Sequence, residues 1–370
     1  MSRSQPTAYS RREALQFGLG AASLIGGGTW AGPAAAASLE EMIGRLLILG
    51  LPGSSAGQAS AQALARHIAN GHAGGVVVLK HNVRSKAGIA ELCRLFNDAG
   101  ALFTCVDQEG GAVQRLSSKL GYTSIPRAAQ VAQRSPAEAR DVYARAAREI
   151  RSTGFNLNLA PVVDLHAAGN PIIGKYGRAY GTDPAVVAEY AAAFIEGHRR
   201  AGVGCTLKHF PGHGTSRGDS HDGAVDITRS WTAAELEPFQ RLVRSGEAEA
   251  IMLGHLYHAE LSDGGEPVTL SRKAVDGVLR GRLGFKGVVV TDDLDMGAIR
   301  RRYPPVEAAI RSLAAGADLV MASNSAQPDD DLAPRMVDAV GEAVAKGRLS
   351  ESRIREAYGR VARFAGRYAI

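Results

Sequence analysis

The stretch Val203–His221, VGCTLKHFPGHGTSRGDSH, joins an apolar run to a glycine-rich loop. Its first five residues are apolar enough for a buried β-strand, and a lysine and a histidine would stand at the end of that strand. In the loop, Asp219 and His221 are two residues apart, so an extended backbone would place both side chains on one side. A carboxylate beside an imidazole can fix the tautomer and orientation of the ring while the ring transfers a proton. The stretch therefore predicts a strand that runs out into a proton-transferring loop.

Short apolar runs alternate with helical patterns throughout residues 45–324. The eight runs, which are the predicted strands, are Leu46–Leu51, Gly75–Lys80, Leu102–Asp107, Phe155–Asp164, Val203–His209, Ala250–His255, Val288–Asp292 and Ala317–Ala322. The stretches with helical patterning include Ala61–Ile68, Ala87–Asp98, Pro136–Ser152, Ala185–Ala201, Ala233–Ser245, Ser271–Arg282 and Val306–Ala315. Near-continuous apolar strands that alternate with helices are typical of parallel β/α architecture, and eight such units in one domain predict a TIM-type (β/α)8 barrel.

Polar residues at the strand ends favour this α/β barrel over an open doubly wound sheet, which is the alternative. Six of the eight runs end in or near a charged or imidazole side chain: Lys80, Asp107, Asp164, Lys208/His209, His255 and Asp292. In a barrel these side chains converge on the C-terminal mouth, whereas an open sheet would spread them along an edge. The segment after Pro328 predicts two C-terminal helices, the second capped by Ser350, that close a single-domain barrel over residues 38–370.

The composition argues against several classes of protein. The chain of 370 residues has a formal net charge of +6, of which residues 1–37 contribute +2, and no Lys/Arg run is long enough to indicate nucleic-acid binding. Cys93, Cys105 and Cys205 lack the spacing of a metal or redox motif, and we expect buried free thiols. The composition thus indicates neither a nucleic-acid-binding protein nor a cysteine-ligated metal site.

Residues 1–37 are predicted to be an export signal rather than part of the fold. Ser10–Leu15 (SRREAL) resembles a twin-arginine motif, Phe17–Trp30 is weakly apolar and rich in Gly and Ala, and Ala34–Ala37 is a small-residue cleavage site. The apolar stretch is too short and too glycine-rich for a transmembrane helix, and no cysteine follows it that could carry a lipid. We therefore expect the twin-arginine export machinery to deliver a mature chain beginning near Ser38 to the periplasm or the medium, without stable membrane insertion.

The barrel prediction gathers a reactive carboxylate and a proton carrier at one mouth. Asp107 ends the third strand, Lys208 and His209 end the fifth, Asp292 ends the seventh, and Arg178 lies in the loop after the fourth. A carboxylate that can attack carbon, together with an Asp-backed histidine, is the minimum set for a two-step displacement. Carboxylates, Arg and Lys each hydrogen-bond several hydroxyls, so the set suits a polyhydroxylated ligand.

Over about residues 40–370 the chain resembles the family-three glycoside hydrolases, in particular their single-domain β-N-acetylhexosaminidase branch. The resemblance rests on Asn158–Asp164 (NLAPVVD), His255, Leu283–Gly287 (LGFKG) leading to Thr291–Asp293 (TDD), and above all the KHFPGHG…DSH string. That string separates this branch from the β-glucosidase branch, in which a second domain usually supplies a glutamate acid. No second domain fits in this chain, so the resemblance implies that the loop histidine takes that role.

The resemblance also implies a role for each residue of the predicted site. Asp292 would be the nucleophile, His221 the general acid/base, and Asp219 the group that orients His221. Substrate contacts would come from Asp107, Arg115, Arg178, Lys208 and His209. The implied enzyme is a retaining exo-β-N-acetylglucosaminidase that hydrolyses terminal β-linked GlcNAc from peptidoglycan fragments or chito-oligosaccharides through a glycosyl-aspartate intermediate. The resemblance implies no metal and no other cofactor.

Two aspects of the site stay open at the level of the residues themselves. Asp292 and Asp293 would point to opposite faces of a strand, and only the family pattern selects Asp292. Asp293 and Asp295 are expected to hold loops and neighbouring cations. Ala112 stands where the family commonly has a basic residue and Ala179 where it commonly has a serine, so substrate length and leaving-group preference are left open.

Other functions on the same scaffold are the alternatives. Phosphorolysis of the intermediate would make a GlcNAc phosphorylase, because a histidine acid/base carries no negative charge to repel phosphate, and a β-glucosidase is a further alternative. The His and Asp density, including His213 and His255, would also suit a metal-dependent barrel hydrolase, but the first strand lacks the His-x-His expected of one. A non-catalytic sugar-binding protein would not need both Asp292 and the Asp219/His221 pair.

Overall fold

The computed structural model describes residues 37–370, and these form an eight-stranded parallel barrel. Its strands are β1 (Leu47–Leu49), β2 (Gly75–Val78), β3 (Phe103–Val106), β6 (Leu157–Asn158), β7 (Gly204–Phe210), β9 (Ala250–Leu253), β11 (Val288–Thr291) and β12 (Val320–Ala322). The order is β11-β9-β7-β6-β3-β2-β1-β12, and every neighbouring pair is parallel. A parallel bridge between Val290 and Leu319 joins the two ends of this order. The predicted barrel is confirmed.

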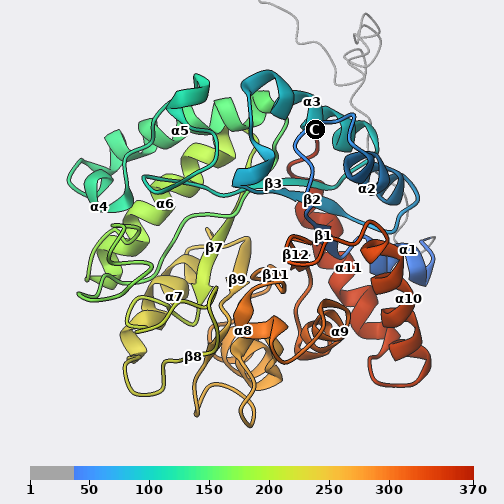
Figure 1. Ribbon diagram of the computed structural model, residues 1–370. Coiled ribbons are helices and arrows are strands. Elements are labelled where there is room, and N and C mark those ends of the chain that lie inside the picture. Colours follow the sequence, from blue (N-terminus) through green and yellow to red (C-terminus); the bar gives the residue numbers. More distant parts are fainter. Residues whose placement is uncertain (1–36) are drawn as a thin grey trace, which may run out of the picture. The chain divides into compact units, whose positions relative to one another are not determined.

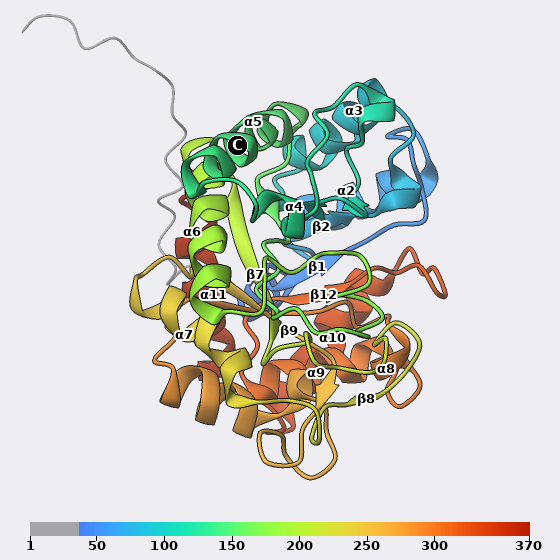
Figure 2. The same ribbon diagram turned by 90° about the vertical axis from the view of Figure 1, so that its left-hand side faces the viewer.

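Helices surround the strands, which lie at the centre of Figure 1 and are seen from the side in Figure 2. The helices are α1 (Leu39–Gly44), α2 (Ala59–Ala69), α3 (Lys86–Asp98), α4 (Ala128–Val131), α5 (Pro136–Thr153), α6 (Pro184–Arg200), α7 (Glu237–Arg244), α8 (Gly297–Arg300), α9 (Pro305–Ala315), α10 (Leu332–Ala345) and α11 (Glu351–Ala365). A π-helix, η5 (Lys273–Arg282), takes the place of the helix predicted over Ser271–Arg282. The two closing helices are α10 and α11, and Ser350 caps α11 by accepting from the N–H of Arg353 (3.2 Å).

The strands are buried along their length, which explains why they read as near-continuous apolar runs. Helices cover their outer side and side chains fill the barrel, so both faces of a strand avoid water. The strand that falls furthest short of its predicted length is β6: its regular pairing ends at Asn158, and only a bridge between Val162 and Lys208 follows. Pro161 lies in this segment and has no N–H to donate to a ladder.

The three cysteines are free and buried, as predicted. Burial raises the pKa of the thiols of Cys93, Cys105 and Cys205 far above the usual range, so all three are protonated. They therefore act as small apolar side chains in the core.

Two small sheets are built from loops beyond the C-terminal ends of the strands. One pairs β4 (Gln108–Gly110) with β5 (Val113–Gln114), and the other pairs β8 (Val225–Asp226) with β10 (Leu256–Tyr257). Across residues 37–370, no helix is both long and apolar enough to cross a bilayer. Apart from Ala37, the predicted export signal lies outside the described residues.

Candidate active site

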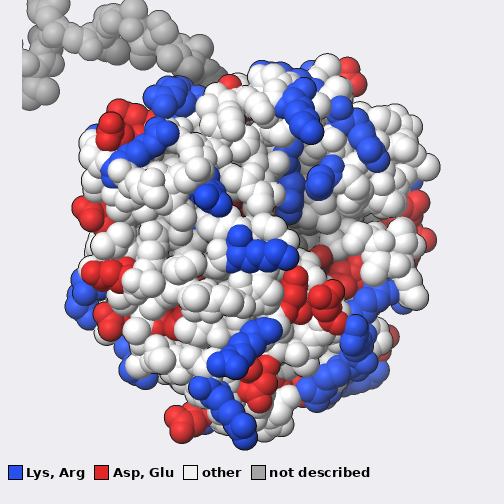
Figure 3. All heavy atoms as spheres, turned by 60° about the vertical axis from the view of Figure 1, so that its left-hand side comes forward, with Lys and Arg blue, Asp and Glu red and all other residues white. Residues whose placement is uncertain are grey.

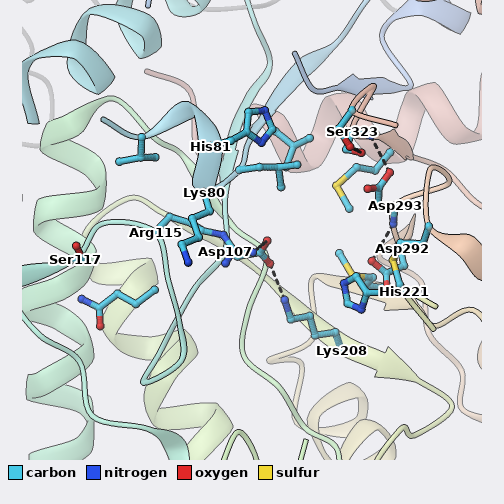
Figure 4. A pocket seen from close by; sticks show the side chains of 18 of the residues that line it. Lys80, His81, Asp107, Arg115, Ser117, Lys208, His221, Asp292, Asp293 and Ser323 are labelled. Carbon is cyan, nitrogen blue, oxygen red and sulfur yellow. Dashed lines mark hydrogen bonds and ion pairs between the residues drawn. The ribbon is translucent and has the colours of Figure 1, made fainter. Parts of the chain in front are cut away.

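The mouth of the barrel opens into a groove with two arms. A larger cavity of about 950 Å³ and a smaller one of about 410 Å³ share five lining residues, and these are all predicted site residues: Asp107, Arg115, Lys208, His221 and Asp292. Arg178 and His209 line the smaller arm alone. Figure 4 shows Asp292 and His221 on one side of the larger cavity, with Asp107 and Lys208 below its centre and Lys80 and Arg115 opposite. The predicted strand-end groups thus meet at one mouth.

An ion-pair network lines the groove where strands β3 and β7 end. Lys208 Nζ lies 2.8 Å from both Asp107 Oδ1 and Glu109 Oε1. Arg178 donates two hydrogen bonds of 2.8 Å to the two carboxylate oxygens of Glu109, and Arg115 donates to Asp107 Oδ2 (3.1 Å). Glu109 lies on the short strand β4 and was not among the predicted site residues.

All members of this network are charged at neutral pH. Burial by itself would raise the pKa of Asp107, but Lys208 and Arg115 lower it further than burial raises it. Burial would likewise raise the pKa of Glu109, but Arg178 and Lys208 lower this pKa to about 2. The two carboxylates in turn keep the pKa of Lys208 above its usual value despite burial. Each polar group that faces the groove therefore has a defined charge with which to bind hydroxyls.

A second buried cluster positions His209. The carboxylate of Asp164, the polar end of the fourth predicted run, accepts from the backbone N–H of His209 (3.1 Å) and of His213 (2.7 Å). Its other oxygen lies 2.7 Å from Nδ1 of His209. Burial, assisted by the neighbouring His209, lowers the pKa of His213 to about 4, so this ring is neutral. Asp164 therefore orients the histidine that faces the groove, and does not itself line either arm.

Asp219 and His221 form the predicted pair, but on a turn rather than on extended backbone. Asp219 Oδ1 lies 2.6 Å from Nδ1 of His221 and also accepts from the backbone N–H of His221 (2.9 Å). Asp222 N–H closes the turn on the carbonyl of Asp219 (3.1 Å). The expectation of an extended segment is wrong because an aspartate side chain that bonds the backbone two residues on stabilises a turn. With Nδ1 facing Asp219, the Nε2 atom of His221 is the nitrogen left to face a ligand.

Residues 211–223 form a loop that we name the acid/base loop after the predicted role of His221. This loop is held against the segment that follows Asp292. The N–H of Gly297 donates to the carbonyl of His221 (3.1 Å), and the N–H of Ala298 donates to the carbonyl of Ser220 (3.2 Å). These two bonds fix the backbone of His221 relative to the strand end that carries Asp292. The loop itself leaves the His221 side chain 63% exposed, so the imidazole can exchange protons with water.

Asp292, Asp293 and Asp295 have different surroundings, and these agree with the predicted division of labour. Asp292 faces both arms of the groove. Asp293 uses one carboxylate oxygen to accept from the backbone N–H of Asp295 (3.0 Å) and of Ser323 (2.7 Å), which ties two loops together. Asp295 pairs with Arg300 and accepts from the N–H of Ser325 (2.8 Å).

The two adjacent carboxylates also differ in pKa. Burial would raise the pKa of Asp292, but His255, His209 and the N–H of Asp293 lower it to below the usual range. Burial raises the pKa of Asp293 to about 6, since its hydrogen bonds do not fully offset the desolvation. At neutral pH Asp292 is therefore an ionised carboxylate, as a nucleophile must be.

His255, at the end of β9, supports this strand end from within the protein. Its Nε2 lies 2.8 Å from the carbonyl of Asp293, and its Nδ1 lies 2.8 Å from the hydroxyl of Thr269. Burial lowers the pKa of His255, although the nearby carboxylate of Asp292 acts in the opposite direction. Within the described part of the chain, no group of three or more His, Cys, Asp or Glu side chains is arranged to hold a metal ion.

The arrangement therefore combines three chemical capacities at one groove. An ionised carboxylate can attack an electrophilic carbon, a carboxylate-backed imidazole can give and take a proton, and a set of buried charges can hold hydroxyl groups in place. Comparison with known proteins places this groove in a family, because the family profile of the glycosyl hydrolase family 3 N-terminal domain matches residues 38–364.

The chain belongs to glycosyl hydrolase family 3.

Members of known sequence and structure resemble this family 3 chain over most of its length. A β-hexosaminidase of Xylella fastidiosa is 38% identical over 270 residues, which are 70% of this chain and 78% of that protein. The structure of a family 3 β-N-acetylglucosaminidase from a Paenibacillus species superposes with a TM-score of 0.80 at 33% identity and covers 90% of this chain; this chain spans 63% of it. The β-N-acetylhexosaminidase of Beutenbergia cavernae superposes with a TM-score of 0.79 at 31% identity, and 90% of this chain and 99% of that protein are covered.

Family membership makes this protein a glycoside hydrolase, and the mouth of the barrel holds the groups that such chemistry needs. The site residues that the sequence analysis missed are those that hold the predicted residues in place. Glu109 is the clearest case. Its acidic side chain stands two positions after Asp107 in the sequence, but its two cationic partners are distant in sequence: Arg178 lies in a loop and Lys208 on strand β7.

Proposed function

We propose that this family 3 protein is a retaining exo-β-N-acetylglucosaminidase. The observation that carries the proposal is the presence of an ionised Asp292 and the Asp219-backed His221 on the same groove. Relatives named β-hexosaminidase and β-N-acetylglucosaminidase support the choice of sugar. The groove also carries the hydroxyl-binding charges that a single terminal sugar requires.

In the proposed reaction the two groups act in sequence. An oxygen of Asp292 attacks the anomeric carbon while His221 protonates the leaving-group oxygen, which gives a glycosyl-aspartate ester and a free alcohol. His221, now neutral, then takes a proton from water as that water attacks the same carbon and frees Asp292. Two inversions at one carbon retain the β configuration. Asp219 stabilises the imidazolium during the first step and is a positioning residue for His221.

A panel of aryl β-glycosides tests the proposal on the chain from Ser38 onward. We expect hydrolysis of the GlcNAc substrate well above that of the glucoside, and a β-anomer as the first product by NMR. Asp292→Ala should lower kcat on the order of 10⁴-fold or more, as nucleophile deletions do. The matched Asp293→Asn variant should lose far less, because the amide oxygen keeps the acceptor for the two backbone N–H groups. An α-anomer as first product would refute the retaining mechanism.

We further propose that acidic peptidoglycan fragments are better substrates than neutral chito-oligosaccharides. Lys80, Arg84 and Lys119 line the larger arm and are exposed, and their side chains make no ion pair or hydrogen bond within residues 37–370. Lys80 lies across the cavity from Asp292 (Figure 4). Unpaired cations in a groove raise the local concentration of anionic ligands. On the face in Figure 3 the two charge signs are interspersed.

The preference for acidic substrates can be tested by comparing an acidic with a neutral disaccharide. The ratio of kcat/KM for a GlcNAc–MurNAc fragment to kcat/KM for the GlcNAc dimer should fall when salt is raised, since salt screens exposed charges. Lys80→Gln with Arg84→Gln should lower the same ratio. Lys346→Gln, at an exposed lysine that follows α10, should leave it unchanged. A ratio that responds to neither salt nor the double variant would contradict the preference.

Water rather than phosphate is the proposed acceptor. His221 carries no negative charge, which would admit phosphate, but the adjacent Asp219 carboxylate restores a negative field at the same place. The check is product analysis in the presence of phosphate. Formation of a sugar 1-phosphate would make the enzyme a phosphorylase.

We propose that the protein is exported to the periplasm by the twin-arginine route. The support is the SRREAL motif and the small-residue segment at Ala34–Ala37. Replacing Arg11 and Arg12 together by lysine should leave the protein uncut in the cytoplasm, with unchanged activity in lysate. Equal amounts of both forms in the periplasm would reject this route.

A further inference from the structure

Tyr176 is exposed at the edge of the groove although it is a large aromatic residue. Within residues 37–370, Tyr176 and the C-terminal Ile370 are the large hydrophobic side chains that remain exposed, Tyr176 by 44%. Tyr176 also lines the smaller arm of the groove. An exposed aromatic ring on a concave, partly apolar surface is typical of a ligand-binding site.

The loop that carries Tyr176 is held firmly from its first residue. Asn170 is 2% exposed; its side-chain oxygen accepts from the N–H of Ile172 (2.9 Å). Its side-chain nitrogen donates to the carbonyls of His213 (2.8 Å) and Gly214 (2.9 Å). Asn170 therefore fastens the Tyr176 loop to the start of the acid/base loop, so the two loops hold a fixed distance from each other.

The other end of the loop is held by Arg178. The two-pronged pair of Arg178 with Glu109 anchors the backbone two residues beyond Tyr176. Between these anchors the ring of Tyr176 makes few contacts that could stabilise the fold. Its phenol makes no hydrogen bond within the described residues, and the ring has a cation–π contact with Lys175, whose Nζ lies 5.4 Å from the ring centroid. A ring that the fold positions but does not use internally is free to meet a ligand.

The arm that Tyr176 lines is bounded both by apolar side chains and by the acid/base loop. Ala112, Val113 and Ile172 line the same arm, as do Ser220 and His221. A leaving group must lie next to the acid that protonates it. A pyranose ring has one face of C–H groups, and such a face packs on an aromatic ring as other apolar surface does.

We propose that the Tyr176 ring is the platform on which the sugar of the leaving group, the residue next to the scissile bond, stacks. The inference rests on the proposed function, because it takes His221 as the acid, and it adds the second subsite of the groove. Ala112 belongs to this subsite, because it lines the same arm and its small side chain leaves the platform open. The ligand class is a pyranoside attached to the terminal GlcNAc. Where that pyranoside is MurNAc, its ring would stack on Tyr176, and the acidic groups that extend from the ring would reach along the groove to the cations of the larger arm.

The experiment compares substrates with and without a second ring. The neutral GlcNAc dimer fills the platform and does not involve the cationic end of the larger arm, whereas methyl β-GlcNAc has a leaving group too small to reach it. Tyr176→Ala should lower kcat/KM for the dimer by about tenfold, chiefly through KM. Cleavage of methyl β-GlcNAc and inhibition by free GlcNAc should stay at wild-type values.

Two matched variants separate stacking from other roles. Tyr176→Phe keeps the ring and should behave as wild type, and Lys175→Gln removes the neighbouring cation and should do the same. An unchanged kcat/KM for the dimer in Tyr176→Ala would overturn the proposal, as would an equal loss on methyl β-GlcNAc or a Phe variant as poor as the Ala variant. If the wild-type chain cleaved no β-GlcNAc substrate at all, the proposed function itself would fail, which is a separate outcome.

Discussion

At the scale of single residues, the surroundings of His221 determine how its loss will appear. Its only side-chain partner within residues 37–370 is Asp219, and it is otherwise exposed. Removing such a side chain leaves no cavity and no buried polar group without a partner. The free energy of unfolding should therefore change little. Its effect on turnover should follow the proton demand of the leaving group.

His221→Ala is therefore expected to discriminate between leaving groups. For the GlcNAc dimer, whose leaving alcohol needs a proton, kcat/KM should fall by about 10²- to 10⁴-fold, the usual contribution of general acid catalysis. A dinitrophenyl β-GlcNAc, whose leaving group departs as an anion, should lose far less. Asp219→Asn keeps an oxygen that can accept from His221 and should give an intermediate loss. The measurement is a plot of kcat/KM against leaving-group pKa, and an equal loss on all substrates would contradict His221 as the acid.

The polar strand ends were the residues most readily predicted from sequence. A charged side chain after a buried strand costs free energy unless it has a partner or a function, so Asp107, Lys208 and Asp292 stood out. Glu109 did not, because its partner Arg178 is 69 positions away and sequence spacing carries no sign of the pair. Tyr176 was missed for the opposite reason: a single aromatic in a loop is ordinary until the fold leaves it exposed.

At the scale of elements, the contact between the acid/base loop and α8 makes Gly297 a testable position. A methyl group at Gly297 would lie 2.6 Å from the carbonyl oxygen of His221 and 3.1 Å from the carbonyl carbon of Asp222. Its backbone is helical, so alanine is conformationally allowed and the effect arises only from this contact.

Gly297→Ala should displace His221 without removing it. A misplacement of about 1 Å costs on the order of 10²-fold in catalysis, so turnover of the GlcNAc dimer should fall by about ten- to a hundredfold. Dinitrophenyl β-GlcNAc should be affected less. Gly277→Ala, at a helical glycine with open space around it, is the matched control and should keep full activity. Wild-type kinetics in both variants would show that the loop does not depend on this contact.

The start of the same loop is held by Glu235, in the 3-10 helix η3 (Ala233–Leu236). Its carboxylate accepts from the N–H (2.8 Å) and hydroxyl (2.7 Å) of Thr215 and from the N–H of Gly214 (3.3 Å). Burial, and then the charge of Asp164, raise the pKa of Glu235 to about 7. The folded protein thus holds this proton more tightly than the unfolded chain does.

Glu235→Gln should therefore change the pH dependence of stability. The stabilising contribution of the protonated Glu235 is complete below pH 4.5 and is lost as the pH rises through 7. Over that window the wild type should lose about 3 kcal/mol in the free energy of unfolding relative to the glutamine variant, from the pKa difference. Urea unfolding at several pH values measures this. Glu342→Gln, at an exposed pair on α10, should run parallel to the wild type, and a parallel profile for Glu235→Gln would contradict the shift.

The strands could be predicted from the sequence because a strand that is buried on both faces appears as a nearly continuous apolar run. Seven of the eight predicted runs contain a strand of the barrel, and the run Val203–His209 overlaps β7, which extends to Phe210. Their ends were less predictable, since hydrogen bonding to neighbours decides where pairing stops, as at Asn158 in β6. The Asp219–Asp222 turn and the π-helix η5 arise from local hydrogen bonds that periodicity does not report.

At the scale of the whole molecule, the barrel is closed by a charged cluster at the end opposite the active site. Asp318, which precedes β12, is fully buried and accepts from Arg280 (2.6 Å), Arg353 (2.5 Å) and Arg360 (3.1 Å). Its carboxylate also accepts from the N–H of Val289 (3.0 Å) on β11. One carboxylate thus joins the last two strands to the π-helix and to α11. This set of contacts around Asp318, the Asp318 clamp, could not be predicted from the sequence. Asp318 is preceded and followed by apolar residues, and its partners lie on three separate segments.

Asp318→Asn should test whether this clamp stabilises the closed barrel. The amide keeps the size of the side chain but removes the charge that faces three guanidinium groups. Arg353 and Arg360 keep Glu356 as a partner. Arg280 loses the anion of its buried pair, and breaking such a pair costs about 3–5 kcal/mol in the free energy of unfolding. The measurement is urea unfolding at neutral pH. Because the clamp lies away from the mouth, kcat at low temperature should stay at the wild-type value, which separates a loss of stability from damage to the site. Glu342→Gln, which removes an exposed carboxylate from a helical pair, should have a much smaller effect. An Asp318→Asn protein as stable as that control would mean that the strands close the barrel by their hydrogen bonds and apolar packing alone.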